Sequence, residues 1–286
     1  MYWVKSVNNQ DKSPISVRSI INLSRQTPWR LTGLRARPQH CFYWITRGQG
    51  RITLGCQTRG FGPNTLIFVP AGVVHKIQLG VNPLGYVAYL PAELSVPVAG
   101  GPRILKVPTV FEQGVVTGYF EQAAGENQSS KAGRNHAMES YLTLITVWIE
   151  RNPHENTWPG RITLTQAHAH AESFLNQLER DLGRFHSVAH YAAGLDLTPT
   201  HLTRLSKQVL DQSAQDVILD RVILEARVLL ADSALPIGRI SATLGFSTPT
   251  YFSRMFNART GMSPRQFRQL KPATSVPGAP KNTLKR

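Results

Sequence analysis

Short runs of apolar and β-branched residues dominate the chain up to about residue 90. Cys41–Thr46 and Arg51–Gln57 flank the tripeptide Gly-Gln-Gly at 48–50, and this arrangement predicts a β-hairpin. Three further runs, separated by turns that contain glycine or proline, follow at Thr65–Val69, Val74–Leu79 and Leu84–Leu90. Closely spaced short strands with such turns are typical of a small barrel or sandwich. We therefore expect a β-rich region that ends at the Pro/Gly-rich stretch Pro91–Pro102.

Helical periodicity replaces the strand pattern further along the chain. Apolar residues recur at the three-and-four spacing of one helix face at Met138, Tyr141, Leu142, Ile145, Trp148 and Ile149. This stripe fits a core face and a dimer surface equally well. Asn152–Gly160, with two prolines and a glycine, is the predicted linker. Only helical patterns follow from Ile162 to the Pro/Gly tail, so we expect domains at 1–155 and 161–270 and a flexible tail at 271–286.

The charge of the chain favours an anionic partner. A net charge of +15 is expected for a protein that binds nucleic acid or a membrane surface. Both halves are basic, but the last part is distinctive, because nine Lys/Arg and no acidic residue follow Asp232. A solvated basic tail accounts for the charges at the very end, but not for arginines spaced through an apolar periodic segment.

Cysteine content and hydropathy indicate a cytoplasmic protein. Two cysteines, Cys41 and Cys56, are too few for a disulfide framework. The segment Met1–Gln10 lacks the apolar region of a signal peptide, and the longest apolar run, near Tyr141–Ile149, is too short to span a bilayer. We expect no membrane partner.

Two C-terminal segments match position by position at an offset of 50 residues. Thr198–Leu205 reads TPTHLTRL and Thr248–Met255 reads TPTYFSRM. Each begins with Thr-Pro, a favourable N-cap followed by proline in the first helical turn. Large apolar residues three positions apart anchor one side of each predicted helix, namely Leu202 with Leu205 and Phe252 with Met255. Small polar residues and an arginine occupy the other side.

A short helix and a tight turn precede each matching segment. The apolar faces of these helices comprise Val188, Tyr191, Ala192 and Leu195 in the first and Ile237, Ile240 and Leu244 in the second. Two short helices joined by three or four residues form a helix-turn-helix, which presents its second helix to the major groove of DNA. Arg204 and Arg254 suit that face because a guanidinium bonds bidentately to guanine or to phosphate. Two purely structural helical hairpins are the alternative, but the duplication beside an acid-free segment favours DNA binding.

Residues from about 168 to 268 resemble the DNA-binding domain of the AraC/XylS family of transcription regulators. The strongest likeness lies in Leu244-Gly245-Phe246, Tyr251–Phe256, Thr260–Pro264 and Phe267-Arg268. Ala214–Asp232 corresponds to the linker helix that joins the two helix-turn-helix units in that family. Asp196 and Asp211 stand where glycine is common, and aspartate tolerates a left-handed conformation there at some cost.

The resemblance implies which residues face DNA. They are Thr200, Thr203, Arg204 and Lys207 in the first recognition helix and Thr250, Tyr251, Ser253 and Arg254 in the second. The cap residues Thr198 and Thr248 and the surface residue His201 complete the predicted set. By the same resemblance the partners are double-stranded promoter DNA, RNA polymerase, a second copy of the chain and a small-molecule effector.

The N-terminal half carries one motif of this family. Pro70–His75 has the Pro-x-Gly-x-x-His form of its cupin-like barrels. A metal-binding cupin also needs two close histidines and a carboxylate upstream, but only His40 stands there and no glutamate lies between residues 12 and 92. We therefore expect no metal and no cofactor, and His75 is a structural or a ligand-contacting residue.

Aromatic residues of the strands are the candidates for an effector pocket. Phe42, Trp44 and Phe68, together with His75, fit the apolar walls and few polar groups of a small-molecule site. They fit a filled core equally well. The arginines that could meet a carboxylate are Arg30, Arg35, Arg37 and Arg47. A weaker likeness to the branch that responds to hydroxylated aromatic acids rests on Val188–Ala193, Ser206 and Ser213-Ala214, and suggests an aromatic acid as effector.

These observations predict an α+β protein with an N-terminal cupin-like β-barrel with helices and a C-terminal all-α domain. The latter holds two helix-turn-helix units joined by a linker helix. The predicted function is that of a sequence-specific, effector-responsive activator, not an enzyme, that reads two successive major grooves per monomer. A cupin-type metalloenzyme with a helical appendage would need bound metal. A nonspecific architectural protein would prefer promoter DNA little over random DNA.

Overall fold

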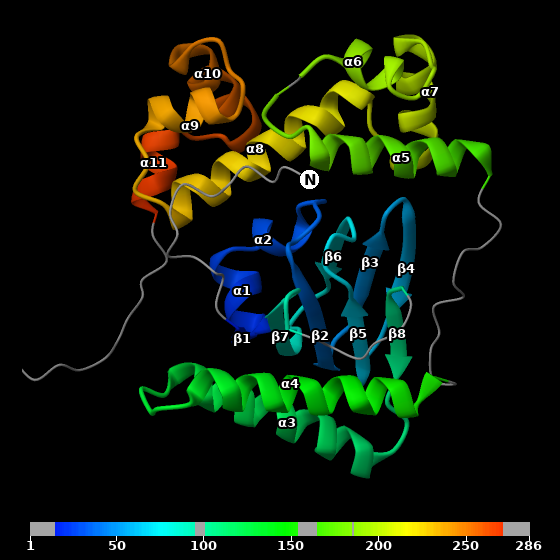
Figure 1. Ribbon diagram of the computed structural model, residues 1–286, viewed down its shortest axis with the longest axis vertical. Helices are drawn as coiled ribbons and strands as arrows, with labels where there is room; N and C mark the ends of the chain where they lie inside the picture. The colour runs from blue at the N-terminus through cyan, green and yellow to red at the C-terminus, as the bar shows by residue number, and fades with distance from the viewer. Residues whose placement is uncertain (1–14, 95–100, 154–164, 185, 271–286) are drawn as a thin grey trace, which may run out of the picture. The chain divides into compact units, whose positions relative to one another are not determined.

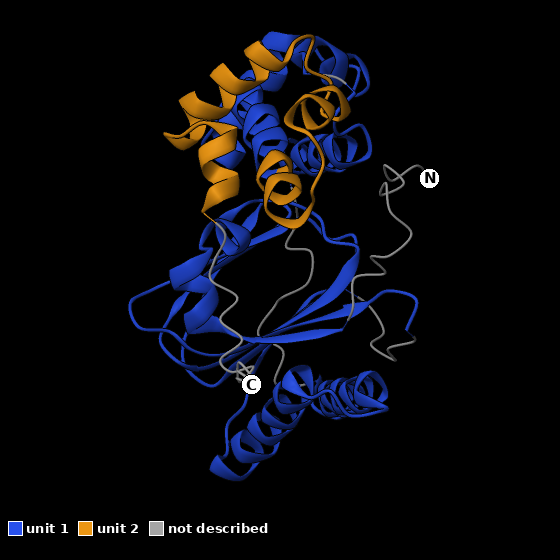
Figure 2. Cartoon of the chain, turned by 90° about the vertical axis from the view of Figure 1, so that its left-hand side faces the viewer, with its two compact units in different colours: residues 1–224 blue, residues 225–286 orange. Residues whose placement is uncertain are grey.

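The computed structural model describes residues 15–94, 101–153, 165–184 and 186–270. The predicted tail at 271–286 and most of the predicted linker Asn152–Gly160 lie outside these residues. The chain divides into two compact units, residues 1–224 and 225–286 (Figure 2). The boundary falls within a single long helix, α8 (Ala214–Asp232), which coincides with the predicted linker helix.

Antiparallel strands form two sheets in the first unit. The five-stranded sheet has the order β1-β7-β2-β5-β8, with bounds Ser16–Ser19, Leu84–Pro91, Gln39–Arg47, Thr65–Val69 and Arg103–Lys106. The three-stranded sheet has the order β4-β3-β6, with bounds Gln57–Phe61, Gly50–Leu54 and His75–Leu79. The predicted β-rich N-terminal region is therefore confirmed, as two facing sheets rather than a closed barrel. It does not end at Pro91–Pro102 as predicted, because β8 follows that stretch and pairs with β5.

The predicted hairpin between the first two strand runs is wrong. β2 pairs with β5 along one edge and with β7 along the other, so neither edge is left for the strand that follows it. β3 lies in the other sheet, where it pairs with β4 and β6. The predicted strand Arg51–Gln57 in fact turns back on itself, because Leu54 pairs with Gln57.

Alternation along β2 divides the core around the two sheets into two parts. Cys41, Tyr43 and Ile45 face the space between the sheets, in a buried cluster with Ile52, Ile67 and Ile77. Phe42 and Trp44 point to the opposite face of the five-stranded sheet. The helices α3 (Val110–Gln128) and α4 (Arg134–Arg151) cover that face (Figure 1). The indole nitrogen of Trp44 donates a hydrogen bond to Thr117 of α3 at 3.0 Å.

The predicted stripe at Met138–Ile149 belongs to α4. Met138, Leu142, Ile145, Trp148 and Ile149 are buried against the sheet, which makes this a core face. Leu144, on another face of the same helix, is 42% exposed.

Short helices complete both units. The first unit also contains α1 (Ile20–Gln26), α2 (Trp29–Thr32), α5 (Gln166–Arg180), α6 (Val188–Ala193) and α7 (Pro199–Leu210). The second unit contains α9 (Ile237–Thr243), α10 (Pro249–Thr260) and α11 (Pro264–Gln269). Within the described ranges, none of the helices has the length and apolar character needed to cross a bilayer.

Candidate nucleic-acid interface

The first helix-turn-helix is built from α6 and α7. The Ser187 hydroxyl caps α6 by accepting a hydrogen bond from the His190 amide, and Thr198 caps α7 by accepting one from the His201 amide. Pro199 follows in the first turn of α7. Tyr191 of α6 and Leu202 of α7 are fully buried and hold the two helices together over α5 and α8. The predicted cap, proline and anchor positions therefore have the local structure that their sequence pattern indicates.

The second helix-turn-helix, α9 and α10, repeats this construction. Thr248 accepts a hydrogen bond from the Tyr251 amide, and Pro249 follows in the first turn of α10. Phe252 is fully buried, like Leu202 at the matching position of the first unit. Its ring packs against those of Phe246 and Phe256, with centroids 5.2 and 5.8 Å away. An aromatic cluster thus takes the place of the aliphatic anchor.

The side chains predicted to face DNA lie on the outer side of both recognition helices. Thr200, His201, Arg204 and Lys207 are exposed on α7, and Thr250, Tyr251 and Arg254 are exposed on α10. Thr203 and Ser253 are half-buried at matching positions. The Ser253 hydroxyl donates to the Pro249 carbonyl at 2.8 Å, so only its lone pairs remain for a ligand. Thr198 and Thr248 are already engaged as caps.

Two aspartates of the first helix-turn-helix have a left-handed backbone, one in the turn before α7 and one at the end of α7. Asp196 and Asp211 have φ values of 56° and 59°. This left-handed conformation is the one predicted from the glycines that are common at these positions in the family. Asp211 ends α7, and Gly261, fifty positions further on, ends α10 with a φ of 75°.

We expect Asp211→Gly to stabilise the chain by up to about 1 kcal/mol, because glycine has no Cβ to crowd the left-handed backbone. The reverse change, Gly261→Asp, should destabilise by a similar amount. Urea denaturation curves would measure both. A loss of stability in Asp211→Gly would show that the aspartate makes an interaction worth more than the relieved crowding.

The four candidate pocket residues of the N-terminal half are not brought together. Phe42, Trp44 and Phe68 all point to α3 and α4 and are buried in the cluster that those helices cover. His75 faces the space between the two sheets, on the other side of β2. The cause is the period of two along a strand, since even-numbered residues of β2 share a face and Tyr43 lies opposite.

His75 occupies a buried, fully hydrogen-bonded position. Its Nδ1 is 2.8 Å from the Val73 carbonyl and its Nε2 is 3.0 Å from the Tyr43 hydroxyl. The neutral ring satisfies both contacts by donating from Nδ1 and accepting at Nε2. Burial, with a smaller contribution from the nearby Arg37 charge, lowers the pKa of His75 to about 3. The geometry therefore gives His75 a structural position.

This pKa predicts acid sensitivity. Between pH 6.5 and about 3 the unfolded chain protonates His75 whereas the folded chain does not, so acid favours unfolding over that range. We expect His75→Gln to flatten the loss of stability between pH 6.5 and 4, measured by urea denaturation at a series of pH values. His201→Gln, which alters an exposed ring, is the control. Parallel slopes for wild type and His75→Gln would contradict the expectation.

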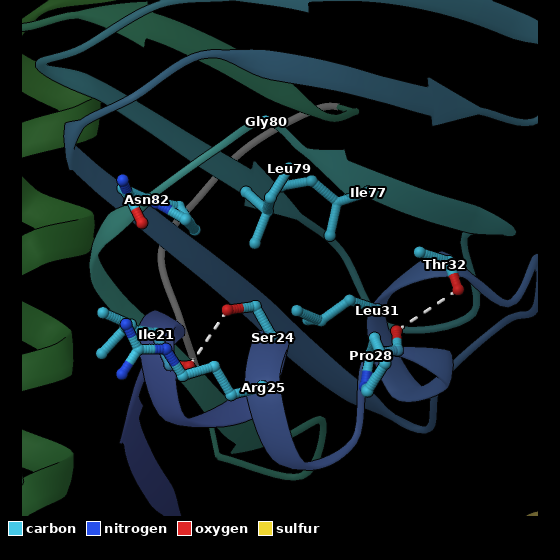
Figure 3. A pocket seen from close by; sticks show the side chains of 11 residues that line it. Ile21, Ser24, Arg25, Pro28, Leu31, Thr32, Ile77, Leu79, Gly80 and Asn82 are labelled. Atoms are coloured by element: carbon cyan, nitrogen blue, oxygen red, sulfur yellow. Dashed lines mark hydrogen bonds between the residues drawn. The ribbon is translucent and has the colours of Figure 1, made fainter.

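A pocket that the sequence did not indicate lies beside the sheets (Figure 3). Its volume is about 270 Å³. Its walls come from α1, α2, β6 and the turn after β6, through Ile21, Ser24, Arg25, Pro28, Leu31, Thr32, Ile77, Leu79, Gly80, Asn82 and Pro83. The helices α1 and α2, which no pattern predicted, form half of it. Across the described part of the chain, no three His, Cys, Asp or Glu residues lie together as metal ligands.

Comparison with known proteins gives two family matches along the chain. Residues 20–93 match the AraC-like ligand binding domain, and residues 191–270 match a helix-turn-helix domain. The chain is thus a DNA-binding transcription regulator with a separate ligand-binding domain. It belongs to the AraC family of regulators.

Relatives with curated functions are regulators as well. The arabinose operon regulatory protein of Salmonella typhimurium is 26% identical over 239 residues, which cover 78% of this chain and 80% of that protein. The transcriptional activator RhaR of Yersinia pseudotuberculosis is 25% identical over 155 residues, 52% of this chain and 51% of that protein. The crystal structure of ToxT from Vibrio cholerae O395 aligns over 91% of this chain and 98% of that chain, with a TM-score of 0.46 and 10% identity.

Proposed function

We propose that this regulator is an effector-responsive activator that binds promoter DNA through two recognition helices per monomer. One monomer inserts α7 and α10 into successive major grooves, whose centres are about 34 Å apart along the duplex. The observation that carries the proposal is the register of the two helices. At an offset of 50 residues they share the threonine cap, the proline, the buried anchor and an exposed arginine.

The proposed contacts divide by chemistry. Arg204 and Arg254 read bases or grip phosphate, because a guanidinium donates two parallel hydrogen bonds. Thr200, Thr203, Thr250 and Ser253 contact bases or backbone, and Lys207, His201 and Tyr251 contact the flanking backbone. The capping groups Thr198 and Thr248 act by fixing the first turn that faces the groove. In this proposal residues 161–270 are the DNA-binding domain and residues 1–155 the ligand-binding domain.

The regulator in this proposal is a cytoplasmic homodimer without catalytic activity. It recruits RNA polymerase and responds to a small molecule, for which an aromatic acid is our candidate. The ligand-binding match at residues 20–93 supports an effector. Among its relatives, one is named for the arabinose operon and another is named an activator. Dimerisation adds specificity because two linked DNA-binding domains engage neighbouring half-sites together. Exposed Leu144 on α4 supports an apolar contact between copies.

The test is the effect of Arg254→Ala on a duplex selected from a random library by the full chain. We expect a loss of about 1–3 kcal/mol, roughly 5- to 150-fold in affinity, on the selected duplex and little change on random DNA. Fluorescence anisotropy at matched salt would measure both. Arg51→Ala, an exposed arginine on β3, removes the same charge away from α10 and is the control.

One outcome would refine this function and another would contradict it. An equal loss on selected and random DNA would reduce Arg254 to a phosphate contact. Equal affinity of the unaltered chain for selected and random duplexes would favour a nonspecific architectural protein.

A further inference from the structure

We propose that the pocket between α1, α2 and β6 is the effector site and that it takes a small organic carboxylate. This inference rests on the proposed function as an effector-responsive regulator. The residues that line this pocket differ from the aromatic residues of β2 and β5 that were predicted from the sequence as pocket candidates. The pocket lies within residues 21–83, inside the stretch that matches the ligand-binding domain.

The walls suit a small, mainly apolar body. Leu31 of α2 and Ile77 and Leu79 of β6 face the same space in Figure 3. Proline rings, Pro28 and Pro83, add further apolar surface. The volume of about 270 Å³ is close to the lower end of the range for small-molecule sites. A ligand of one ring or a short chain matches that volume.

The two hydroxyl groups of the pocket already donate hydrogen bonds to backbone carbonyl groups. Ser24 donates to the Ile21 carbonyl at 3.0 Å, and Thr32 donates to the Pro28 carbonyl at 3.3 Å (Figure 3). Each oxygen keeps lone pairs, so each can accept a hydrogen bond but cannot donate one to an anion. A hydroxyl group on the ligand body would find acceptors here. The carboxylate must bind elsewhere in the pocket.

Arg25 is the one charged side chain in the lining. It projects from α1, next to Ser24, and the side-chain amide of Asn82 adds a second possible donor across the pocket. The surrounding sequence strengthens the attraction for anions, because residues 12–92 contain ten Lys/Arg and no Asp or Glu. No carboxylate of this stretch therefore competes with a ligand for Arg25, and a charge-assisted bond to a carboxylate is favoured.

The strand β6 connects this pocket to the first helix-turn-helix. Ile77 and Leu79 line the pocket, and Val74, just before the strand, lies in the buried cluster with Phe174 and Tyr191 of α5 and α6. A ligand that shifts β6 would thus press on the core that supports the recognition helix α7. Effector binding and DNA affinity are linked through this strand in our proposal.

Calorimetric titration of the full chain would test the site with three acids and their neutral amides. The pairs are benzoate with benzamide, 4-hydroxybenzoate with 4-hydroxybenzamide, and hexanoate with hexanamide. We expect at least one acid to bind with its amide ten-fold weaker or more. Arg25→Gln should remove that preference for the acid. Arg51→Gln, an exposed arginine outside the pocket, should leave it within two-fold.

Acids that bind no better than amides, or equal losses in Arg25→Gln and Arg51→Gln, would overturn the inference. Anisotropy with the selected DNA, run on the same protein, separates this failure from failure of the regulator function. Specific DNA binding without acid binding would contradict the assignment of this pocket as the effector site but would leave the proposed regulator function intact. Acid binding that depends on Arg25, without specific DNA binding, would support the pocket and contradict the function.

Discussion

Replacing Glu179 with alanine should lower the free energy of unfolding of the first unit by about 3–5 kcal/mol. The Glu179 carboxylate meets Arg221 of α8 in a two-bond pair, with Nε to Oε1 at 2.7 Å and Nη2 to Oε2 at 2.9 Å. The two side chains are only 10% and 5% exposed. Losing the carboxylate would remove a buried acceptor of two charge-assisted hydrogen bonds from the Arg221 guanidinium, and that is what makes the change costly.

The same carboxylate also joins two parts of the first unit. Glu179 lies on α5, and it accepts a hydrogen bond at 3.0 Å from the amide of Ala36, in the segment between α2 and β2. Ala36 belongs to the buried cluster of α5 to α8. Glu179→Ala is therefore expected to weaken effector control of DNA affinity as well as stability.

Urea denaturation followed by tryptophan emission would measure the loss, because Trp29, Trp44 and Trp148 all lie in the first unit. The matched control is the double variant Glu179→Met/Arg221→Leu. An apolar pair of similar volume avoids the buried charge and should recover most of the lost stability. A change below about 0.5 kcal/mol in the single variant, the size typical of surface substitutions, would contradict the importance of this pair.

Truncation of Phe252 to alanine should have an effect of similar size in the second unit. A buried phenylalanine contributes about 3–5 kcal/mol relative to alanine. Phe252 is fully buried and its ring contacts those of Phe246 and Phe256, while Phe256 packs in turn against Phe267 of α11 at 5.5 Å. The second unit comprises only residues 225–286, and a domain with such a small core has a low free energy of unfolding. We expect α9 to α11 to unfold in this variant.

Two optical signals would separate this local unfolding from global unfolding. All five tryptophans precede residue 225, so their emission should persist while helical circular dichroism decreases. Tyr251→Ala, which removes an exposed ring from the same helix, is the control and should keep the full helical signal. Joint loss of both signals in Phe252→Ala would show that the two units do not unfold independently.

The sequence predicted the DNA-binding half well because its signals are local. Thr198 and Thr248 cap helices through contacts three residues away, and proline fixes the first turn, so neighbouring residues determine both features. Each of these patterns also occurs twice, at an offset of 50 residues, which strengthened the prediction. Helix α3 carried such a signal too, since the Thr109 hydroxyl accepts a hydrogen bond from the Glu112 amide and donates one to the Glu112 carboxylate. Glycines at 114, 118 and 125, however, obscure its helical pattern.

The N-terminal half was predicted less well because its contacts are distant in sequence. Whether β2 pairs with β3 or with β7 depends on partners about forty residues away, and the Gly-Gln-Gly turn does not decide between them. The aromatic residues of β2 could not be assigned to a face without knowing where α3 and α4 pack. The pocket joins α1 to β6 across more than fifty residues, so no local pattern marks it.

Hydroxyl-radical footprinting of the full chain on its selected DNA tests the central claim most directly. Each bound monomer should protect two patches on one face of the duplex, about 10–10.5 base pairs apart. Arg204→Ala should weaken one patch and Arg254→Ala the other. Continuous protection that is the same on random DNA, or an equal effect of both variants on every patch, would show that α7 and α10 do not read adjacent grooves.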